Sequence, residues 1–262
     1  MEMHINSEPS LLKLYKLLDQ HGKKISPRGE TTYEIENFTY NVAPGVRFNN
    51  FTGRNLNLDY IKREMAWYIH ADPHDLSITE HAAQWGRIVA NGKLNSNYGS
   101  YWFGKYGVRH IVQLLQNDPS SRRAVIPMYG TDTDHMDIEA KDVPCTLSIG
   151  FRIRDHKVNA HAIMRSQDIL WGMGNDLPTF SILHEIVARL LDLPMGILSV
   201  HVGSFHVYES RMSMFKSIID KAEYRNIKDR PPNIERLEAE GLIRGQINPQ
   251  FAFSQWLLNL DH

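Results

Sequence analysis

The one cysteine of this 262-residue chain, Cys145, is a candidate nucleophile. A thiolate attacks electrophilic carbon, but it needs positive charge nearby to be stable. Arg165, one predicted strand further along the chain, and the adjacent Arg122 and Arg123 could supply that charge. Convergent arginines beside a serine, here Ser166, also suit a phosphate group. A lone cysteine is more often a small buried hydrophobic residue, and adjacent arginines are more often solvated, so both interpretations stay open.

Further polar residues could serve acid–base catalysis or ligand binding. Glu64 lies among apolar residues in REMAWY, where a carboxylate is either an exposed ion-pair partner or an acid–base group. Asp168 and Asp176 flank the turn sequence WGMGN and could equally cap a helix or stabilise the turn. His206 and Tyr208 in GSFHVYE place two polar groups on one face at the end of a strand.

The composition excludes several classes of protein. Lys and Arg total 29 against 30 Asp and Glu, and this net charge of −1 argues against a binder of polymeric nucleic acid. The chain has no stretch of 18 apolar residues and its first residues do not resemble a signal peptide, so we expect a cytoplasmic protein without a membrane span. No Cys and His spacing indicates a metal site. Without a linker, a single domain over residues 1–262 is expected.

The periodicity of apolar residues predicts the elements that must position these groups. An antiparallel hairpin with a turn at 155–156 begins at Cys145 and ends just before Arg165, and Pro178 is expected just ahead of an amphipathic helix. The order of the elements favours a mixed α+β architecture over repeated βαβ units. The predicted segments are helices at 11–18, 59–70, 109–116 and 208–222, a hairpin within 31–42 that turns at 36–37, a loop at 91–99, strands at 145–154, 157–164 and 197–202, and a packed terminal segment at 251–260 after a surface loop that begins at 229.

Taken in order, several of these motifs resemble the thymidylate synthase superfamily. The similarity runs from about residue 28 to about residue 208 and is strongest in DPSSRRAV, VPC, the MRSQD…G…ND run and GSFHVY. Within that superfamily, YIKREMAWY, LNSNYG, RIRDHKVNAHAIMRSQD and VGSFHVY are most similar to the phage deoxycytidylate hydroxymethylases. The resemblance implies an α+β fold, with one mixed sheet packed against helices in a single domain.

Three departures from ordinary thymidylate synthases are informative. Thr146 follows the cysteine where the synthases have histidine, and Val202-Gly203-Ser204 replaces their GGD sequence. Asp176 stands where the synthases read uracil with asparagine. An asparagine amide matches the N3–H donor and O4 acceptor of uracil. A carboxylate instead accepts from the 4-amino group and the protonated N3 of cytosine, so Asp176 indicates a cytosine nucleotide.

The resemblance implies a reaction in which the Cys145 thiolate attacks C6 of the pyrimidine. C5 then takes a one-carbon unit from 5,10-methylenetetrahydrofolate, and addition of water gives 5-hydroxymethyl-dCMP and tetrahydrofolate. Glu64 would organise water and proton transfers, and Tyr98 would belong to the same polar network. Asp176 would act both in catalysis and in binding of the base.

The resemblance also implies the binding residues and a homodimer. Arg28, Arg165 and Ser166 would hold the phosphate, and Arg122 and Arg123 would reach in from a second subunit. His206 and Tyr208 would bind the sugar 3′-hydroxyl, and Asp168 would contact the folate pterin. Trp85 would pack against the pterin, although an isolated tryptophan is more typical of a core. The chain ends in WLLNLDH rather than in the synthases' short apolar tail, so the resemblance supports residues 229–262 least.

Other functions stay open at the level of sequence. The substrate could be the ribonucleotide CMP, as in pathways to modified-pyrimidine natural products. An unusual thymidylate synthase acting on dUMP is disfavoured by Asp176 and Thr146. A non-catalytic nucleotide-binding homologue, one that binds RNA included, would have no need of Cys145, Glu64, Arg165 and Asp168 together.

Overall fold

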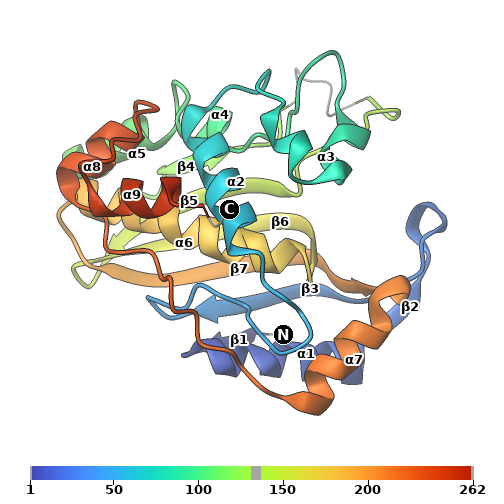
Figure 1. The fold of residues 1–262 in the computed structure, drawn as a ribbon. Helices are drawn as coiled ribbons and strands as arrows, with labels where there is room; N and C mark the ends of the chain where they lie inside the picture. Colours follow the sequence, from blue (N-terminus) through green and yellow to red (C-terminus); the bar gives the residue numbers. More distant parts are fainter. Residues whose placement is uncertain (1, 131–136, 261–262) are drawn as a thin grey trace.

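One mixed sheet of seven strands organises the chain in a computed structural model, which describes residues 2–130 and 137–260 (Figure 1). The strand order is β1-β3-β7-β6-β5-β4, and β2 pairs with the free part of β3. β6 and β7 are parallel, while β3 and β5 flank them in antiparallel orientation. The strands are β1 (Glu2–Ile5), β2 (Lys23–Ile25), β3 (Thr32–Val42), β4 (Val125–Pro127), β5 (Thr146–Arg154), β6 (Lys157–Asp168) and β7 (Met195–Tyr208).

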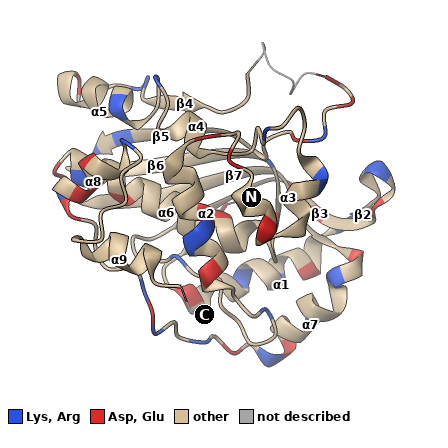
Figure 2. Ribbon diagram, turned by 45° about the horizontal axis from the view of Figure 1, so that its top comes forward, with Lys and Arg blue, Asp and Glu red and all other residues tan. Residues whose placement is uncertain are grey.

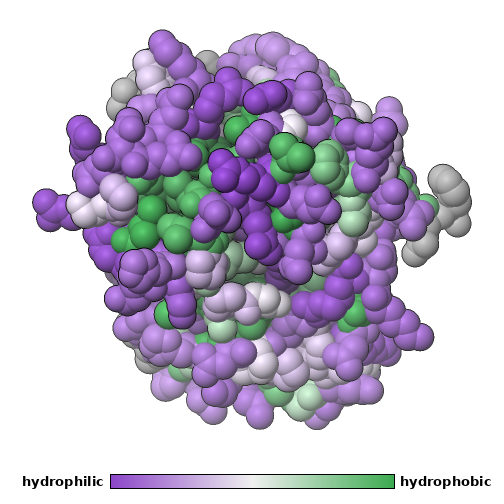
Figure 3. All heavy atoms as spheres, turned by 90° about the vertical axis from the view of Figure 1, so that its left-hand side faces the viewer, coloured by the Kyte–Doolittle hydropathy of each residue, from purple (hydrophilic) through white to green (hydrophobic). Residues whose placement is uncertain are grey.

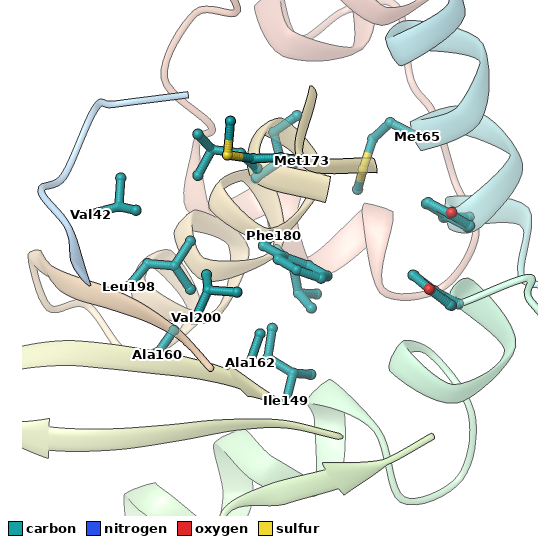
Figure 4. Close-up of a cluster of buried hydrophobic side chains, with 14 of the residues drawn as sticks. Val42, Met65, Ile149, Ala160, Ala162, Met173, Phe180, Leu198 and Val200 are labelled. Carbon is teal, nitrogen blue, oxygen red and sulfur yellow. The ribbon is translucent and has the colours of Figure 1, made fainter. Parts of the chain in front are cut away.

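Helices pack on the sheet, as the predicted α+β class requires. The long helix α6 is buried along most of its length and lies against the sheet. Figure 4 shows its Phe180 between Met65 of α2 and the strand residues Ile149 and Ala162, in the middle of the core. The helices are α1 (Leu12–His21), α2 (Leu58–His70), α3 (Ala83–Ile88), α4 (Gly99–Trp102), α5 (Val108–Asn117), α6 (Gly172–Leu190), α7 (Met212–Lys221), α8 (Arg236–Leu242) and α9 (Ala252–Leu258), with 3-10 turns η1 (Glu8–Leu11), η2 (Pro27–Gly29), η3 (Ser77–Glu80) and η5 (Glu209–Arg211).

The surface carries both signs of charge. Lysines and arginines are interspersed with aspartates and glutamates over the elements visible in Figure 2. On the face drawn in Figure 3, the largest group of hydrophobic residues lies left of centre, and smaller hydrophobic groups are scattered among hydrophilic residues over the rest of the face. In the described part of the chain, no helix is long and apolar enough to cross a membrane.

The hairpin predicted within residues 31–42 is wrong, because this segment is the single strand β3. Asn37 adopts a left-handed conformation with φ of 50°, which asparagine tolerates better than most residues. Its neighbours Glu36 and Phe38 nevertheless stay in one continuous register, opposite Ser204 and Val202 of β7. The long partner strand holds the chain straight where the local sequence indicates a turn.

The helix predicted after Pro178 begins earlier than expected, at Gly172, so the proline lies inside α6. Proline has no N–H and leaves the carbonyl four residues earlier without its helical partner. The hydroxyl of Thr179 bonds to the carbonyl oxygens of Asn175 and Asp176, at 2.9 and 3.1 Å, in this first half of the helix. Burial against the sheet therefore outweighs the local cost of the proline.

The segment predicted as a surface loop from residue 229 contains the short helix α8, which the sequence analysis did not predict.

The close approach of α4 to α2 yields a prediction about stability. A Cβ atom at Gly99 would lie 1.7 Å from the carbonyl oxygen of Tyr68, which is backbone and cannot rotate away. We expect Gly99→Ala to lower the free energy of unfolding by about 3 kcal/mol or more, measured by denaturant titration. Gly86→Ala in α3 is the control, because nothing lies within 4 Å of the added methyl group. Equal stability of the two variants would contradict the close approach.

Candidate active site

Two adjoining cavities open where β6 and β7 end, and together they collect most of the predicted site residues. The first, of about 330 Å³, is lined by Glu64, Trp85, Tyr98, Cys145, Asp168 and Asp176, among others. The second, of about 500 Å³, is lined by Arg28 and Arg165. Ser166, His206 and Tyr208 line both cavities. A ligand with an anionic end and a planar end could therefore occupy both at once.

Cys145 lies half-buried directly before β5, beside the strand that carries Arg165. The hydroxyl of Ser166 donates to its sulfur at 3.7 Å. The Arg165 guanidinium donates to the carbonyl oxygens of Pro144 and Val143, at 3.0 and 2.7 Å, and thereby fixes the segment that precedes the cysteine. The same arginine borders the second cavity, so one side chain connects the candidate nucleophile with the candidate anion site.

The second cavity has a basic side and an unexpected acidic side. Arg28, at the 3-10 turn η2, has a left-handed backbone with φ of 53° and faces the same cavity as Arg165. Glu30 and Glu34 also line this cavity. Glu34 is buried and accepts a hydrogen bond from the hydroxyl of Ser204. The sequence reading missed Glu34, although its position in the strand opposite His206 follows once the β3–β7 register is known.

His206 and Tyr208 lie at the end of β7, where the two cavities meet. The His206 Nδ1 atom is 3.1 Å from the Ser204 carbonyl oxygen, which fixes the orientation of the ring. The rings of His206 and Tyr208 are 5.2 Å apart and perpendicular. Because Nδ1 is directed to the backbone, Nε2 is the ring atom that remains for a ligand.

Glu64 is a buried carboxyl group on α2, only 4% exposed. Burial raises its pKa to about 8, and the hydrogen bond that it accepts from the Tyr60 hydroxyl, at 2.7 Å, opposes this rise. The Tyr60 hydroxyl in turn accepts a 2.7 Å hydrogen bond from Nε1 of Trp85. Glu64 is therefore protonated at neutral pH and lies beside the cavity that holds Cys145. A group of this kind can exchange a proton with a ligand.

Asp176 lies at the wall of the first cavity, near the start of α6. Burial raises its pKa to about 7, a hydrogen bond from Gln167 lowers it, and the charge of Asp168 raises it further. The Gln167 amide donates to Asp176 at 2.9 Å, and its oxygen accepts from the buried Tyr40 hydroxyl at 2.8 Å. Tyr40 thus fixes which end of the amide faces Asp176, and the carboxyl group is held in one orientation.

Asp168, the last residue of β6, both stabilises a turn and faces the cavity. Its Oδ2 atom accepts from the backbone N–H of Trp171 at 2.6 Å. Its Oδ1 atom is buried and has no hydrogen-bond partner among the described residues. Burial raises the pKa of this carboxyl group. An unpaired buried acceptor is costly, so this atom suits a ligand that brings an N–H group.

Tyr98, directly before α4, and Trp85, in α3, border the same cavity. The Tyr98 hydroxyl accepts from the backbone N–H of Thr146 at 3.3 Å, directly after Cys145. Its ring stacks on Tyr68 with centroids 5.5 Å apart, and burial raises its pKa well above the ordinary value. Trp85 is half-buried and packs on Trp67 with ring centroids 5.4 Å apart. Trp85 is therefore partly a core residue, as its isolated sequence context suggested.

Arg122 and Arg123 line neither of the two cavities of this chain. Both are exposed and precede β4. Their expected role, in which they reach the site of a second subunit, stays a prediction.

Among the described residues, no group of three His, Cys, Asp or Glu could hold a metal ion.

Besides Glu34, the sequence analysis did not identify Tyr60 and Gln167 as polar residues of this site. Each contacts a predicted site residue directly, Tyr60 at Glu64 and Gln167 at Asp176. A signal for Tyr60 was available, since a residue four positions before Glu64 lies on the same face of a helix. Nothing in the sequence pairs Gln167 with Asp176.

With this geometry in place, comparison with known proteins defines the class. The family model described as thymidylate synthase matches residues 11–242, and the chain belongs to the thymidylate synthase family. That family takes its one-carbon unit from 5,10-methylenetetrahydrofolate, and its fold is the α+β architecture found here. The pterin of this cofactor carries N–H donors, which fit the unpaired Asp168 Oδ1 atom beside Trp85.

Three relatives illustrate the range within the family. A deoxyuridylate hydroxymethyltransferase of Bacillus phage SP01 is 26% identical over 205 residues, 72% of this chain and 54% of that protein. One of Pseudomonas phage M6 is 31% identical over 149 residues, 52% of this chain and 42% of that protein. A thymidylate synthase of Buchnera aphidicola is 22% identical over 224 residues, 82% of this chain and 84% of that protein. The chain spans about half the length of these two phage relatives.

The buried Glu64 yields a prediction about pH and stability. In the unfolded chain its carboxyl group ionises near pH 4.5, whereas in the folded protein it keeps its proton to about pH 8. Between these values the folded state binds the extra proton, so its stability falls as pH rises. Glu64→Gln removes this loss and keeps the acceptor for Tyr60. We expect the variant to gain nothing below pH 4.5 and about 4 kcal/mol at pH 8, measured by denaturant unfolding.

The matched control is Glu80→Gln, which changes an exposed carboxylate of η3. A solvated carboxylate loses little hydration on folding, so its variant should track the parent protein at every pH. A gain of Glu64→Gln that does not depend on pH would contradict the protonated state of Glu64.

Proposed function

We propose that this protein hydroxymethylates the cytosine nucleotide dCMP at C5, with 5,10-methylenetetrahydrofolate as the one-carbon donor. The observation that carries the proposal is the Asp176 carboxyl group, which Gln167 holds at the wall of the cavity that also contains Cys145. Family membership supports the one-carbon chemistry, and two phage hydroxymethyltransferases among the relatives support the addition of water.

The chemistry of Asp176 favours cytosine over uracil. A carboxyl group whose pKa is about 7 carries a proton that it can share with N3 of cytosine, while its other oxygen accepts from the 4-amino group. Attack on C6 pushes electrons into the ring and makes N3 more basic, so the proton moves to N3 as charge develops. The O4 atom of uracil is a far weaker base than N3. The gain in the transition state is therefore larger for cytosine.

The remaining residues divide the work between the two cavities. In the second cavity Arg28, Arg165 and Ser166 bind the phosphate, and His206 and Tyr208 bind the sugar hydroxyl. In the first, the Cys145 thiolate bonds to C6 and leaves again at the end, while Glu64 moves protons and orients water. Asp168 and Trp85 hold the folate, which supplies a one-carbon unit at the oxidation level of formaldehyde. Tyr98 orders the segment after the nucleophile.

Hydroxymethylation of dUMP is the second candidate, because both phage relatives are described as deoxyuridylate hydroxymethyltransferases. CMP hydroxymethylation and methylation of dUMP are further alternatives. The test incubates the protein with 5,10-methylenetetrahydrofolate and separately with dCMP, CMP and dUMP, and weighs each product by mass spectrometry. A gain of CH₂O on dCMP supports the proposal. The same gain mainly on dUMP or CMP, or a CH₂ gain on dUMP, would replace it.

Base selection should depend on Asp176. We expect Asp176→Asn to lower kcat/KM for dCMP about 10²- to 10³-fold and to raise that for dUMP, because the amide matches the uracil edge. Arg28→Ala, which acts on the phosphate that both nucleotides carry, is the control. It should slow the reaction on both nucleotides and leave their ratio unchanged. An unaltered ratio of dCMP to dUMP activity in Asp176→Asn would refute this account of base recognition.

We expect Arg122 and Arg123, which are exposed just before β4, to belong to a site shared between two subunits. In support, the isolated chain leaves Val125, Ile163 and Ile197 of three sheet strands exposed, as a sheet-mediated dimer needs. Arg122→Ala and Cys145→Ala homodimers should both be inactive. After mixing and subunit exchange, activity should return to about a quarter of the parent value, since half the dimers then hold one complete site. No recovery in confirmed mixed dimers would exclude the shared role of Arg122.

A further inference from the structure

A chain of two hydrogen bonds joins Trp85 to Glu64 through Tyr60, and all three residues line the first cavity. Nε1 of Trp85 donates to the Tyr60 hydroxyl, and that hydroxyl donates to Oε1 of Glu64, each at 2.7 Å. An indole N–H can only donate, so the Tyr60 oxygen must be the acceptor in the first bond. The one proton of the hydroxyl is then directed to Glu64. The chemistry of the three groups therefore sets the direction of the chain.

The chain joins a partly accessible residue to a more deeply buried one. Trp85 is half-buried and Tyr60 is 8% exposed, while Glu64 is 4% exposed. Hydrogen bonds in series strengthen one another where little water is present. Any contact that moves the Trp85 ring therefore changes how strongly Tyr60 donates to Glu64.

We propose that Tyr60 is a positioning residue that couples the placement of Trp85 to the proton held by Glu64. In the reaction proposed above, on which this inference rests, Trp85 borders the folate. Contact of the folate with Trp85 then strengthens or weakens the donor at Glu64, and so times the step in which Glu64 gives or takes a proton. Tyr60 touches neither nucleophile nor base in this scheme and acts through Glu64.

Other titratable groups surround Glu64 and have to be separated from it. Tyr60 and Tyr68 of α2 and Asp176 of α6 act on its carboxyl group, and Tyr98 and Cys145 line the same cavity. The buried Lys62 of α2 is ion-paired with Asp229 at 2.6 Å. Of these groups Asp176 titrates in a range close to that of Glu64, so the experiment must distinguish the two carboxyls.

The test follows the indole N–H resonance of Trp85 by ¹H–¹⁵N NMR in the ligand-free protein, assigned with Trp85→Phe. We expect this resonance to titrate with a midpoint near pH 8, and the titration to be lost in both Glu64→Gln and Tyr60→Phe. Trp67 is an internal control, since its Nε1 donates to the backbone carbonyl of Asp75 at 2.7 Å, which does not ionise. Its resonance should stay constant and reports that each variant is folded.

Two results would overturn the proposal: a Trp85 resonance that does not move between pH 6 and 9, or one that still titrates in Glu64→Gln. The latter would assign the titration to Asp176. The NMR test uses no nucleotide or folate, so its outcome does not depend on whether dCMP is the substrate.

Kinetics give a second measurement of the same coupling. With whichever nucleotide is turned over, Tyr60→Phe should lower kcat about five- to tenfold with KM nearly unchanged. Because the Tyr60 hydrogen bond lowers the pKa of Glu64, its loss should also move the pH dependence of kcat to higher pH. Trp85→Phe keeps an aromatic ring but loses the N–H, and should move the pH dependence less but in the same direction. A loss of activity without a changed pH profile would assign Tyr60 a merely structural role.

Discussion

The parallel pairing of β6 with β7 is the constraint on which the whole site depends. Parallel strands end at the same edge of a sheet, and this pair aligns Ser166 with Ser204 and Asp168 with His206. Two motifs that lie about forty residues apart in the sequence are thereby brought side by side at that edge. β5 adds Cys145 from the outer side of β6, and α6 begins from the same edge with Asp176. A shift of one residue in this register would turn the site residues of the shifted strand to the other face.

Burial is the second constraint, and it works against stability. Enclosing Glu64 and Asp176 raises both pKa values towards neutrality, which makes each group able to exchange protons at physiological pH. The folded state must then take up protons that the unfolded chain releases, and this costs free energy at neutral pH. The surrounding hydrogen bonds from Tyr60 and Gln167 limit that cost and fix the direction of each carboxyl group. The large hydrophobic core around α6 stabilises the fold and offsets this free-energy cost of the site.

The sequence predicted the parts of this site that reside in contiguous motifs. The antiparallel hairpin of β5 and β6 and the helix that carries Glu64 are confirmed, because their apolar periodicity matches their environment. The β3 segment was misread because the turn-like Glu36-Asn37 pair is overruled by its long partner strand. The start of α6 was predicted wrongly for a similar reason. Proline is disfavoured inside a helix, but burial of α6 against the sheet outweighs the cost of Pro178. Tyr60, Gln167 and Glu34 could not be assigned, because their roles follow from contacts between segments rather than from spacing within one.

The two cavities also differ in charge, and this difference limits how the proposed nucleotide can bind. Arg28 and Arg165 border the second cavity, together with Glu30 and Glu34, whereas the described lining of the first gathers three carboxyl groups and no lysine or arginine. If Glu64, Asp168 and Asp176 were all ionised, their mutual repulsion and that of a phosphate dianion would be severe in so little water. The protons held at neutral pH by Glu64 and in part by Asp176 relieve this repulsion. In the proposed reaction the phosphate is thus directed to the arginines and the base to the carboxyl groups, and the protons that make this orientation possible are the ones that the proposed chemistry uses.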